Sequence, residues 1–284
     1  MKKIAIQGEN GSNSHMAAAE MFAGSNPAAE VVPCDVSGEV IRKVVAREVD
    51  GALLPIENSL HGSVAEHFDL LLAQPVRVVR ESSMRIRHHV LAGRGVRLED
   101  VRTVRSHPVA LSQCRRWLTE HPGIVAVPFY DTAGSVKHIL KEGFRDAAAI
   151  APALSAGVYG ADVLVEGVED HAENYTRFLL IVGEGADGRE VSGDVGPANK
   201  ISVAFTVEHR PGTLVRALEG LARIGADLTK IESRPVSGHP WEYVFYVDLR
   251  FEQEAIADAA LDLLRIGCRS VKELGRYRAA AALV

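Results

Sequence analysis

The chain has 284 residues, 47% of them hydrophobic and 24% charged, which is typical of a folded globular protein with room for two domains. Its formal net charge of −5 argues against nucleic-acid binding, which favours a basic surface. No apolar run is long enough to span a membrane, no apolar signal core follows Met1, and the three scattered cysteines are typical of reduced thiols, so we expect a cytoplasmic protein.

Residues 1–183 alternate between strand and helix patterns. Short apolar runs predict strands at 3–7, 31–34, 51–55, 76–81, 86–91, 101–105, 124–129, 147–151, 163–168 and 174–181. Helices are predicted between them at 16–22, 37–49, 65–72, 109–118, 131–142 and 152–159. This alternation predicts an α/β fold with mainly parallel sheets. A crossover near residue 76 and a return near residue 166 predict two lobes around a ligand-binding cleft.

A polar loop follows the predicted strand 51–55. It contains Glu57, Asn58 and Ser59, and ligands of open α/β sheets bind at the carboxyl ends of strands. Ser63 is explained as the N-cap of the next helix, with Glu66 as its capping-box partner. Capping leaves the other three polar residues unexplained, so they are candidates for a binding site.

Two further turns connect a strand to a helix. The Gly-rich turn 8–15 would place backbone N–H groups at a helix N-terminus, which suits an anion, although such a turn is also a plain β-to-α connection. In the second turn, Ser106 is either the N-cap of the following helix, with Pro108 in its first turn, or a group that faces the cleft together with His107 and Gln113.

The adjacent histidines His88 and His89 do not predict a metal site. Neighbours on a strand face opposite sides of the sheet, and no third ligand stands at a suitable spacing. We therefore expect no bound metal.

The stretch 174–181 changes from polar to apolar along a predicted strand. If the strand enters the core from a cleft, Thr176 offers a hydroxyl and Arg177 a planar cation for a carboxylate. A sheet strand with an exposed start explains the same pattern, since Thr is a good strand former. The residues alone leave both interpretations open.

The Gly-rich, polar segment 184–199 has the composition of a linker. Beyond it the predicted order is strand 201–207, helix 211–224, strands 228–236 and 243–251, helix 254–266 and strand 270–277. This βαββαβ order predicts a small ferredoxin-like α+β domain.

Five segments of the sequence, in this order, resemble the prephenate dehydratase family that carries a C-terminal ACT regulatory domain. They are Pro-Ile-Glu-Asn-Ser at 55–59, Tyr-Asp-Thr-Ala-Gly at 130–134, Thr-Arg-Phe at 176–178, Pro-Gly-Thr-Leu-Val at 211–215 and Ile-Glu-Ser-Arg-Pro at 231–235. The resemblance covers nearly the whole chain. It implies a two-lobed catalytic domain over 1–183, similar to a periplasmic binding protein, and an ACT domain over 200–278.

The family converts prephenate to phenylpyruvate, water and carbon dioxide without a cofactor. The resemblance implies that Thr176 helps the departing hydroxyl, either as a proton donor or only as a hydrogen-bond donor. It also implies that Arg177 holds a substrate carboxylate and that Phe178 packs beneath the ring. The other substrate contacts that it implies are Glu57, Asn58, Ser59, Ser106 and Gln113.

The ACT resemblance implies regulation by phenylalanine and assembly as a homodimer or homotetramer. The effector contacts that it implies are Gly212, Thr213, Leu214, Asp227, Leu228, Glu232, Ser233 and Arg234. The sequence departs from the family at two positions: the family usually has an aromatic residue where Asn13 stands, and Asn where Asp227 stands.

Two alternatives remain from the sequence. An arogenate dehydratase would act on the amino analogue of prephenate, with Glu57 as a candidate partner for the ammonium group. A non-catalytic sensing protein would capture an amino acid or keto acid in the cleft.

Overall fold

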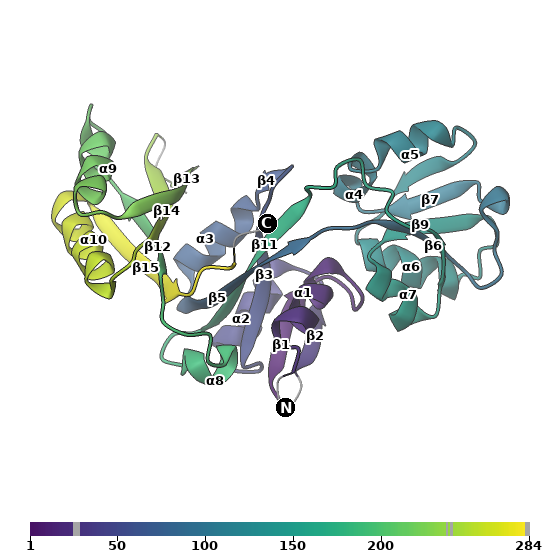
Figure 1. Ribbon diagram of the computed structural model, residues 1–284, viewed down its shortest axis with the longest axis horizontal. Helices are drawn as coiled ribbons and strands as arrows, with labels where there is room; N and C mark the ends of the chain where they lie inside the picture. Colours follow the sequence, from purple (N-terminus) through teal and green to yellow (C-terminus); the bar gives the residue numbers. More distant parts are fainter. Residues whose placement is uncertain (25–28, 237, 239–240, 282–284) are drawn as a thin grey trace. The chain divides into compact units, whose positions relative to one another are not determined.

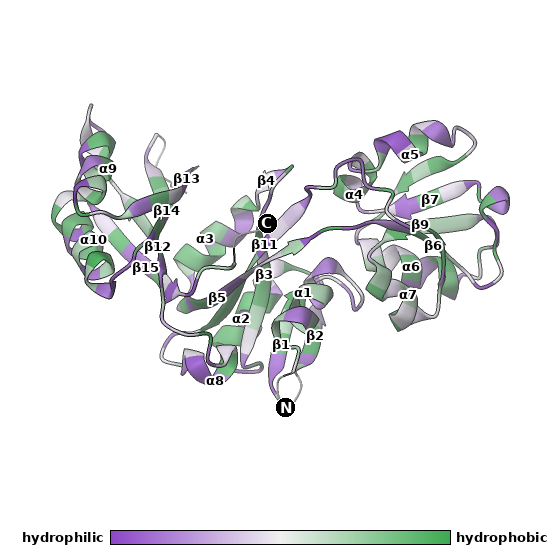
Figure 2. Ribbon diagram, in the orientation of Figure 1, coloured by the Kyte–Doolittle hydropathy of each residue, from purple (hydrophilic) through white to green (hydrophobic). Residues whose placement is uncertain are grey.

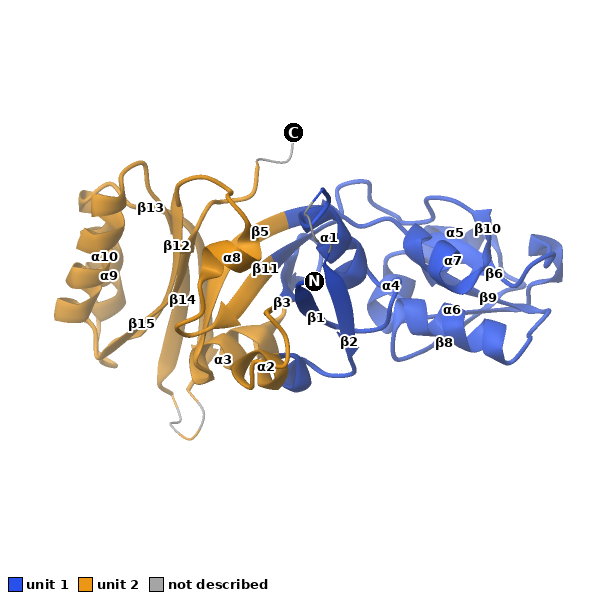
Figure 3. Ribbon diagram, turned by 90° about the horizontal axis from the view of Figure 1, so that it is seen from below, with its two compact units in different colours: residues 1–40, 53–63, 83–178 blue, residues 41–52, 64–82, 179–284 orange. Residues whose placement is uncertain are grey.

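The computed structural model describes residues 1–24, 29–236, 238 and 241–281 (Figure 1). The chain divides into two compact units, which Figure 3 colours separately: unit 1 contains 1–40, 53–63 and 83–178, and unit 2 contains 41–52, 64–82 and 179–284. These units do not follow the predicted boundaries at 183 and 199, which stay predictions. Among the described residues, no helix is both long and apolar enough to cross a bilayer.

The first sheet has the strand order β2-β1-β3-β11-β5, with the short β4 paired to β3. Its strands are β1 (Lys3–Gln7), β2 (Glu30–Cys34), β3 (Gly51–Asn58), β4 (Gly62–Ser63), β5 (Val76–Arg85) and β11 (Tyr175–Gly183). The first helices of the chain are α1 (Asn13–Met21), α2 (Ser37–Val45) and α3 (Ala65–Ala73). The apolar run of β1 is fully buried, as expected for a strand inside the sheet.

The second sheet lies in unit 1 and has the order β10-β6-β9-β7-β8. Its strands are β6 (His89–Ala92), β7 (Thr103–Ser106), β8 (Val125–Pro128), β9 (Ala147–Ala151) and β10 (Asp162–Val165). Its helices are α4 (Pro108–Ser112), α5 (Arg115–Glu120), α6 (Thr132–Lys141) and α7 (Ala153–Tyr159). The expectation of mainly parallel pairing is wrong here, because β6 runs antiparallel to both β9 and β10, and only β7 pairs in parallel.

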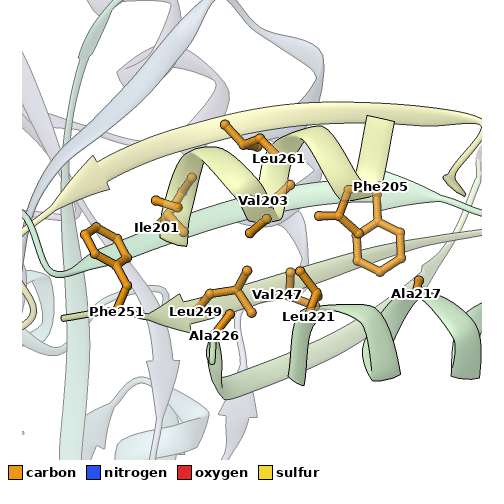
Figure 4. Packing of buried hydrophobic residues seen from close by; sticks show 13 residues of the cluster. Ile201, Val203, Phe205, Ala217, Leu221, Ala226, Val247, Leu249, Phe251 and Leu261 are labelled. Atoms are coloured by element: carbon orange, nitrogen blue, oxygen red, sulfur yellow. The ribbon is translucent and has the colours of Figure 1, made fainter. Parts of the chain in front are cut away.

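The C-terminal part forms the predicted βαββαβ domain. Its elements are β12 (Lys200–Thr206), α9 (Thr213–Arg223), β13 (Asp227–Pro235), β14 (Tyr243–Arg250), α10 (Glu254–Gly267) and β15 (Ser270–Tyr277). The sheet order is β13-β14-β12-β15, and the pairs are antiparallel. One face packs on α9 and α10, with Val203, Val247 and Leu261 among the buried side chains that fill the layer (Figure 4).

Within unit 2, other residues of this sheet contact α3 and β5. The ring of Tyr246 lies 5.1 Å from that of Phe68 on α3. The Lys272 ammonium donates to three carbonyls at the C-terminal end of α3, those of Leu71, Leu72 and Gln74. A Gly stands at position 275 because a Cβ there would collide with the backbone of Val78 on β5.

Several predicted local features are wrong. Strand β3 continues through Asn58 instead of ending at residue 55, and Val64, not Ser63, is the N-cap residue of α3. The predicted helix 109–118 is two helices that break at Gln113. The segment 184–199, whose role as a linker stays a prediction, contains a short helix, α8 (Gly188–Ser192), whose hydrophilic residues stand out in purple in Figure 2.

Candidate active site

A cavity of about 280 Å³ lies within unit 1. It is formed where the connection from β1 to α1 approaches the connection from β8 to α6, beside the start of β11. Most of its lining residues have polar side chains, and the lining consists of Gln7, Gly8, Glu9, Ser12, Asn13, Ser14, Asp35, Pro55, His107, Tyr130, Asp131, Thr132, Thr176 and Phe178.

Strand β11 brings two of the predicted residues to this cavity. Thr176 and Phe178 are two positions apart, so they share one side of the strand, and both line the cavity. Thr176 is 9% exposed and Phe178 only 1%. The hydroxyl is therefore held in a largely desolvated position, where a hydrogen bond is stronger than in water.

Asn58 holds the Thr176 hydroxyl. Its side-chain Nδ2 donates toward three acceptors, at 2.7 Å to Asn174 Oδ1, 3.0 Å to Thr176 Oγ1 and 3.1 Å to the Tyr175 carbonyl. The amide orientation is fixed by its other end, because Oδ1 accepts from the backbone N–H groups of Leu60 and His61, which can only donate. Asn58 therefore donates to the Thr176 oxygen and is a positioning residue in this arrangement.

Ser59 also joins two segments of unit 1. Its hydroxyl donates to the Glu173 carbonyl and accepts from the Tyr175 N–H, at 2.9 Å each. The Ser59 N–H donates to the Tyr175 carbonyl. Ser59 therefore connects the end of β3 to the start of β11. It does not line the cavity.

Arg177 and Glu57 do not face the cavity that Thr176 and Phe178 line. Arg177 follows Thr176 in β11 and so points away from it, and its Nη1 lies 3.9 Å from Glu57 Oε2. Neither residue lines the cavity. That Arg177 holds a substrate carboxylate and that Glu57 meets an ammonium group both stay predictions.

Ser106 and Gln113 are buried rather than exposed to the cavity. Ser106 is 0% exposed and its hydroxyl donates to the Ile150 carbonyl. It is not the N-cap of α4, a position that His107 occupies. Gln113 is 5% exposed and contacts two imidazoles, at His88 and His61. A direct substrate contact of either residue stays a prediction.

The cavity contains an ion-paired carboxylate that sequence analysis missed. Glu9 accepts a hydrogen bond from the Tyr130 hydroxyl at 2.8 Å and contacts the Lys137 ammonium at 3.0 Å. Burial, followed by the hydrogen bond to Glu9, raises the pKa of Tyr130. Glu9 lies in the Gly-rich turn 8–15 and Tyr130 in the segment 130–134. Both segments were singled out from the sequence, but neither residue was predicted to belong to the site.

Asp131 and His107 complete this wall. Asp131 is the N-cap of α6 and accepts from the Gly134 N–H at 2.7 Å. Burial raises the pKa of Asp131 despite this bond, and burial lowers the pKa of His107, which favours a neutral imidazole. The N-termini of both α1 and α6 reach the cavity through Ser12 and Thr132, and such termini attract carboxylates.

The residues that the structure describes contain no group of three or more His, Cys, Asp or Glu side chains suited to a metal ion. That the protein works without a metal or a cofactor stays a prediction.

A second cavity, of about 460 Å³, lies in the βαββαβ domain. Of the predicted effector residues, Gly212, Thr213 and Leu214 line it, together with residues 207–211, Val215, Glu242, Tyr243 and Phe245. The five other predicted residues, Asp227, Leu228, Glu232, Ser233 and Arg234, stand on β13 and are not in its lining. Arg234 instead pairs with Asp69 of α3 at 3.1 Å.

Comparison with known proteins identifies the family. The model of the family "Prephenate dehydratase" matches residues 4–186. Arogenate dehydratase/prephenate dehydratase 2 of Arabidopsis thaliana is 37% identical over 97% of this chain and 72% of its own length. A solved prephenate dehydratase of Arthrobacter aurescens, in complex with L-Phe, is 31% identical with a TM-score of 0.86, over 98% of this chain and 90% of that one.

A second solved structure is equally similar but carries a different description. GqqA, described as a novel type of quorum quenching acylase, is 31% identical with a TM-score of 0.85 over 98% of both chains. The family model and the relatives of known name nevertheless agree over most of the sequence. On this evidence the chain belongs to the prephenate dehydratase family.

Proposed function

We propose that this protein is a prephenate dehydratase, a hydro-lyase that forms phenylpyruvate in phenylalanine biosynthesis. The reaction breaks the bond between the ring and its carboxylate and releases carbon dioxide. The electron pair moves into the ring, the C–O bond breaks, and the hydroxide takes up a proton and leaves as water. Aromatisation supplies the driving force, so the protein has to supply geometry and a donor for the departing hydroxyl.

The position of Thr176 is the observation that carries the proposal. Because Asn58 Nδ2 donates to Thr176 Oγ1, the hydroxyl hydrogen of Thr176 is directed away from that amide. The side chain lines the cavity beside the Phe178 ring, so this hydrogen is available to the leaving hydroxyl. A donor held in this way gains strength in the transition state, where negative charge develops on the oxygen.

Arogenate is a second candidate substrate, favoured by the charge of the lining. Three carboxylate side chains, Glu9, Asp35 and Asp131, line the cavity, and a carboxylate attracts the ammonium group that arogenate has and prephenate lacks. Asn13, which replaces the usual aromatic residue, also lines the cavity, and its buried Oδ1 has no hydrogen-bond partner among the described residues. A carbonyl oxygen can accept from an ammonium group but not from a keto group.

Steady-state kinetics with prephenate and arogenate, side by side on the purified chain, test the proposal. We expect turnover of prephenate to phenylpyruvate, and turnover of arogenate to phenylalanine if the carboxylates of the lining accept the ammonium group. Exhaustive treatment with a chelator should leave the rate unchanged. Tight binding without turnover would favour the sensing alternative. Hydrolysis of an N-acyl amine without dehydratase turnover would favour the activity named for GqqA.

Regulation by phenylalanine forms part of the same proposal. The 460 Å³ cavity beside the start of α9 suits an amino acid, and the similar protein of Arthrobacter aurescens was solved with L-Phe. The edge strand β13 exposes Leu228 and Ile231, and an exposed apolar edge favours pairing with a second copy. We therefore propose a homodimer or homotetramer, which sedimentation analysis tests; the cytoplasmic location stays a prediction.

A matched pair of glycine variants tests the effector site. Gly212 and Gly225 both have positive φ, at 82° and 78°, so valine costs about 1–2 kcal/mol of backbone strain at either. Only Gly212 lines the cavity. We expect Gly212→Val to abolish phenylalanine binding in calorimetry and Gly225→Val to retain it. Equal binding by both variants would contradict this effector site.

A further inference from the structure

A chain of hydrogen bonds in unit 1 links a buried histidine to the turn that follows Asn58. His88 Nε2 lies 2.8 Å from Gln113 Oε1, and Gln113 Nε2 lies 3.1 Å from His61 Nδ1. His61 Nε2 in turn lies 3.2 Å from the Ser112 hydroxyl. We call His88, Gln113, His61 and Ser112 the histidine–glutamine chain.

The direction of every bond in this chain follows from one backbone carbonyl. The Ser112 hydroxyl donates to the Val109 carbonyl at 2.7 Å, so it accepts from His61 Nε2–H. His61 Nδ1 is then the acceptor for the Gln113 amide, and Gln113 Oε1 accepts from His88 Nε2–H. The bond from Gln113 uses the lone pair of His61 Nδ1, whereas His88 Nε2–H donates in either protonation state. Burial lowers the pKa of His88, which favours its neutral form.

The backbone of His61 connects the histidine–glutamine chain to Asn58, and Asn58 connects it to Thr176. The His61 backbone N–H donates to Asn58 Oδ1 at 3.1 Å, and the Leu60 N–H donates to the same oxygen at 3.0 Å. The opposite end of that amide donates to Thr176 Oγ1. Holding the His61 ring therefore holds the turn that fixes the orientation of Asn58.

We propose that His61 and Gln113 are positioning residues for the Thr176 hydroxyl, acting through Asn58. Gln113 is 5% exposed, each of its amide atoms already has a partner, and it does not line the cavity. His61 is exposed, and its ring crosses from the turn after β3 to the break between α4 and α5. This inference rests on the proposed function, because the measured effect is on turnover.

Three variants of His61 separate a positioning role from a general need for an imidazole. An asparagine places a carbonyl oxygen near the position of Nδ1 and can accept from Gln113, whereas alanine cannot. Because one exposed hydrogen bond contributes about 0.5–1.5 kcal/mol, we expect His61→Ala to lower kcat by about twofold to twelvefold with KM changed by less than about twofold. His61→Asn should restore most of kcat, and His61→Gln should not, since its amide lies nearer the Nε2 position.

Gln113→Leu and a matched histidine control complete the experiment. Gln113→Leu should lower kcat like His61→Ala, and the double variant should be no slower than the slower single variant, because both remove one link. His171, which is exposed in the same unit, is the control: His171→Ala should leave kcat and KM unchanged. Thermal unfolding midpoints of all variants check that they are folded.

Three results would overturn the positioning role while the wild type remains active. They are unchanged kcat in His61→Ala, a raised KM with unchanged kcat in Gln113→Leu, and additive losses in the double variant. If Gln113→Leu does not fold, the exposed His61 variants still decide the question. A wild-type chain that turns over neither prephenate nor arogenate would overturn the proposed function, and the positioning role with it.

Discussion

Two polar networks, one in each unit, are built from opposite kinds of group. In unit 1 the contacts around Asn58 are neutral: amides, a hydroxyl and imidazoles. In unit 2 a charged cluster contains Lys200, Glu81 and Asp248, each less than 8% exposed. The Lys200 ammonium lies 3.1 Å from Glu81 and 3.8 Å from Asp248.

The charged cluster joins the βαββαβ sheet to strand β5. Lys200 begins β12, Glu81 stands on β5, and Asp248 on β14 accepts from the Ser202 hydroxyl at 2.5 Å. Burying charges is costly unless they are paired with good geometry. We infer that the charged cluster specifies how two segments of unit 2 pack, while the neutral network orients a single side chain, the hydroxyl of Thr176.

The largest effect should follow from breaking the charged cluster. Lys200→Met removes the ammonium that faces both carboxylates, and the loss of one partner of a buried ion pair costs about 3–5 kcal/mol. Denaturant unfolding should show this decrease in the free energy of unfolding. Lys200→Met combined with Glu81→Leu should recover part of it, because an apolar pair replaces the ion pair. A single variant as stable as the wild type would show that the cluster contributes no specificity.

A smaller effect should follow from reversing one bond of the neutral network. Asn58→Asp keeps the oxygen that accepts from the Leu60 and His61 N–H groups but replaces the donor to Thr176 by an acceptor. The Thr176 hydrogen would then turn to the carboxylate and away from the substrate. We expect kcat to fall by about a hundredfold, in the range for a lost catalytic donor, with a thermal midpoint near that of the wild type. A raised KM with unchanged kcat in Asn58→Asp would contradict the positioning role and would indicate that Asn58 binds the substrate.

The smallest effect concerns Asp131. Its folded pKa is raised by burial, so its contribution to stability is present below the ordinary carboxyl pKa and is lost as pH rises through the folded pKa. Asn caps a helix as well as Asp but does not ionise. Asp131→Asn should therefore change stability by less than about 1 kcal/mol and gain relative to the wild type as pH rises. Unfolding midpoints across pH measure this, and a relative gain toward acid pH would contradict the assignment.

Patterns local in sequence predicted most of the fold. Strands 147–151 and 270–277 match β9 and β15 residue for residue, because their apolar or alternating composition decides their conformation. The βαββαβ order was predictable for the same reason. The break at Gln113 was not, since it depends on imidazoles 25 and 52 positions away.

The site was predictable in part. Thr176 and Phe178 line one cavity, and the alternation of a strand places Arg177 on the other side of β11. The catalytic and binding roles of the three residues stay predictions. The partners of buried polar groups were not predictable from the sequence. Lys200 and Glu81 are 119 positions apart, and Glu9 and Tyr130 are 121 apart, so no local pattern links them.

The central claim is that a hydroxyl at position 176 donates to the departing group. Two variants test it most directly in prephenate turnover. Thr176→Ser keeps the hydroxyl and loses the methyl group, whereas Thr176→Val keeps the shape and loses the hydroxyl. We predict that Thr176→Ser retains kcat within about tenfold, whereas Thr176→Val loses about a hundredfold to ten-thousandfold, the usual contribution of a positioned proton donor, with KM little changed. A folded Thr176→Val protein with near-wild-type kcat would contradict the account.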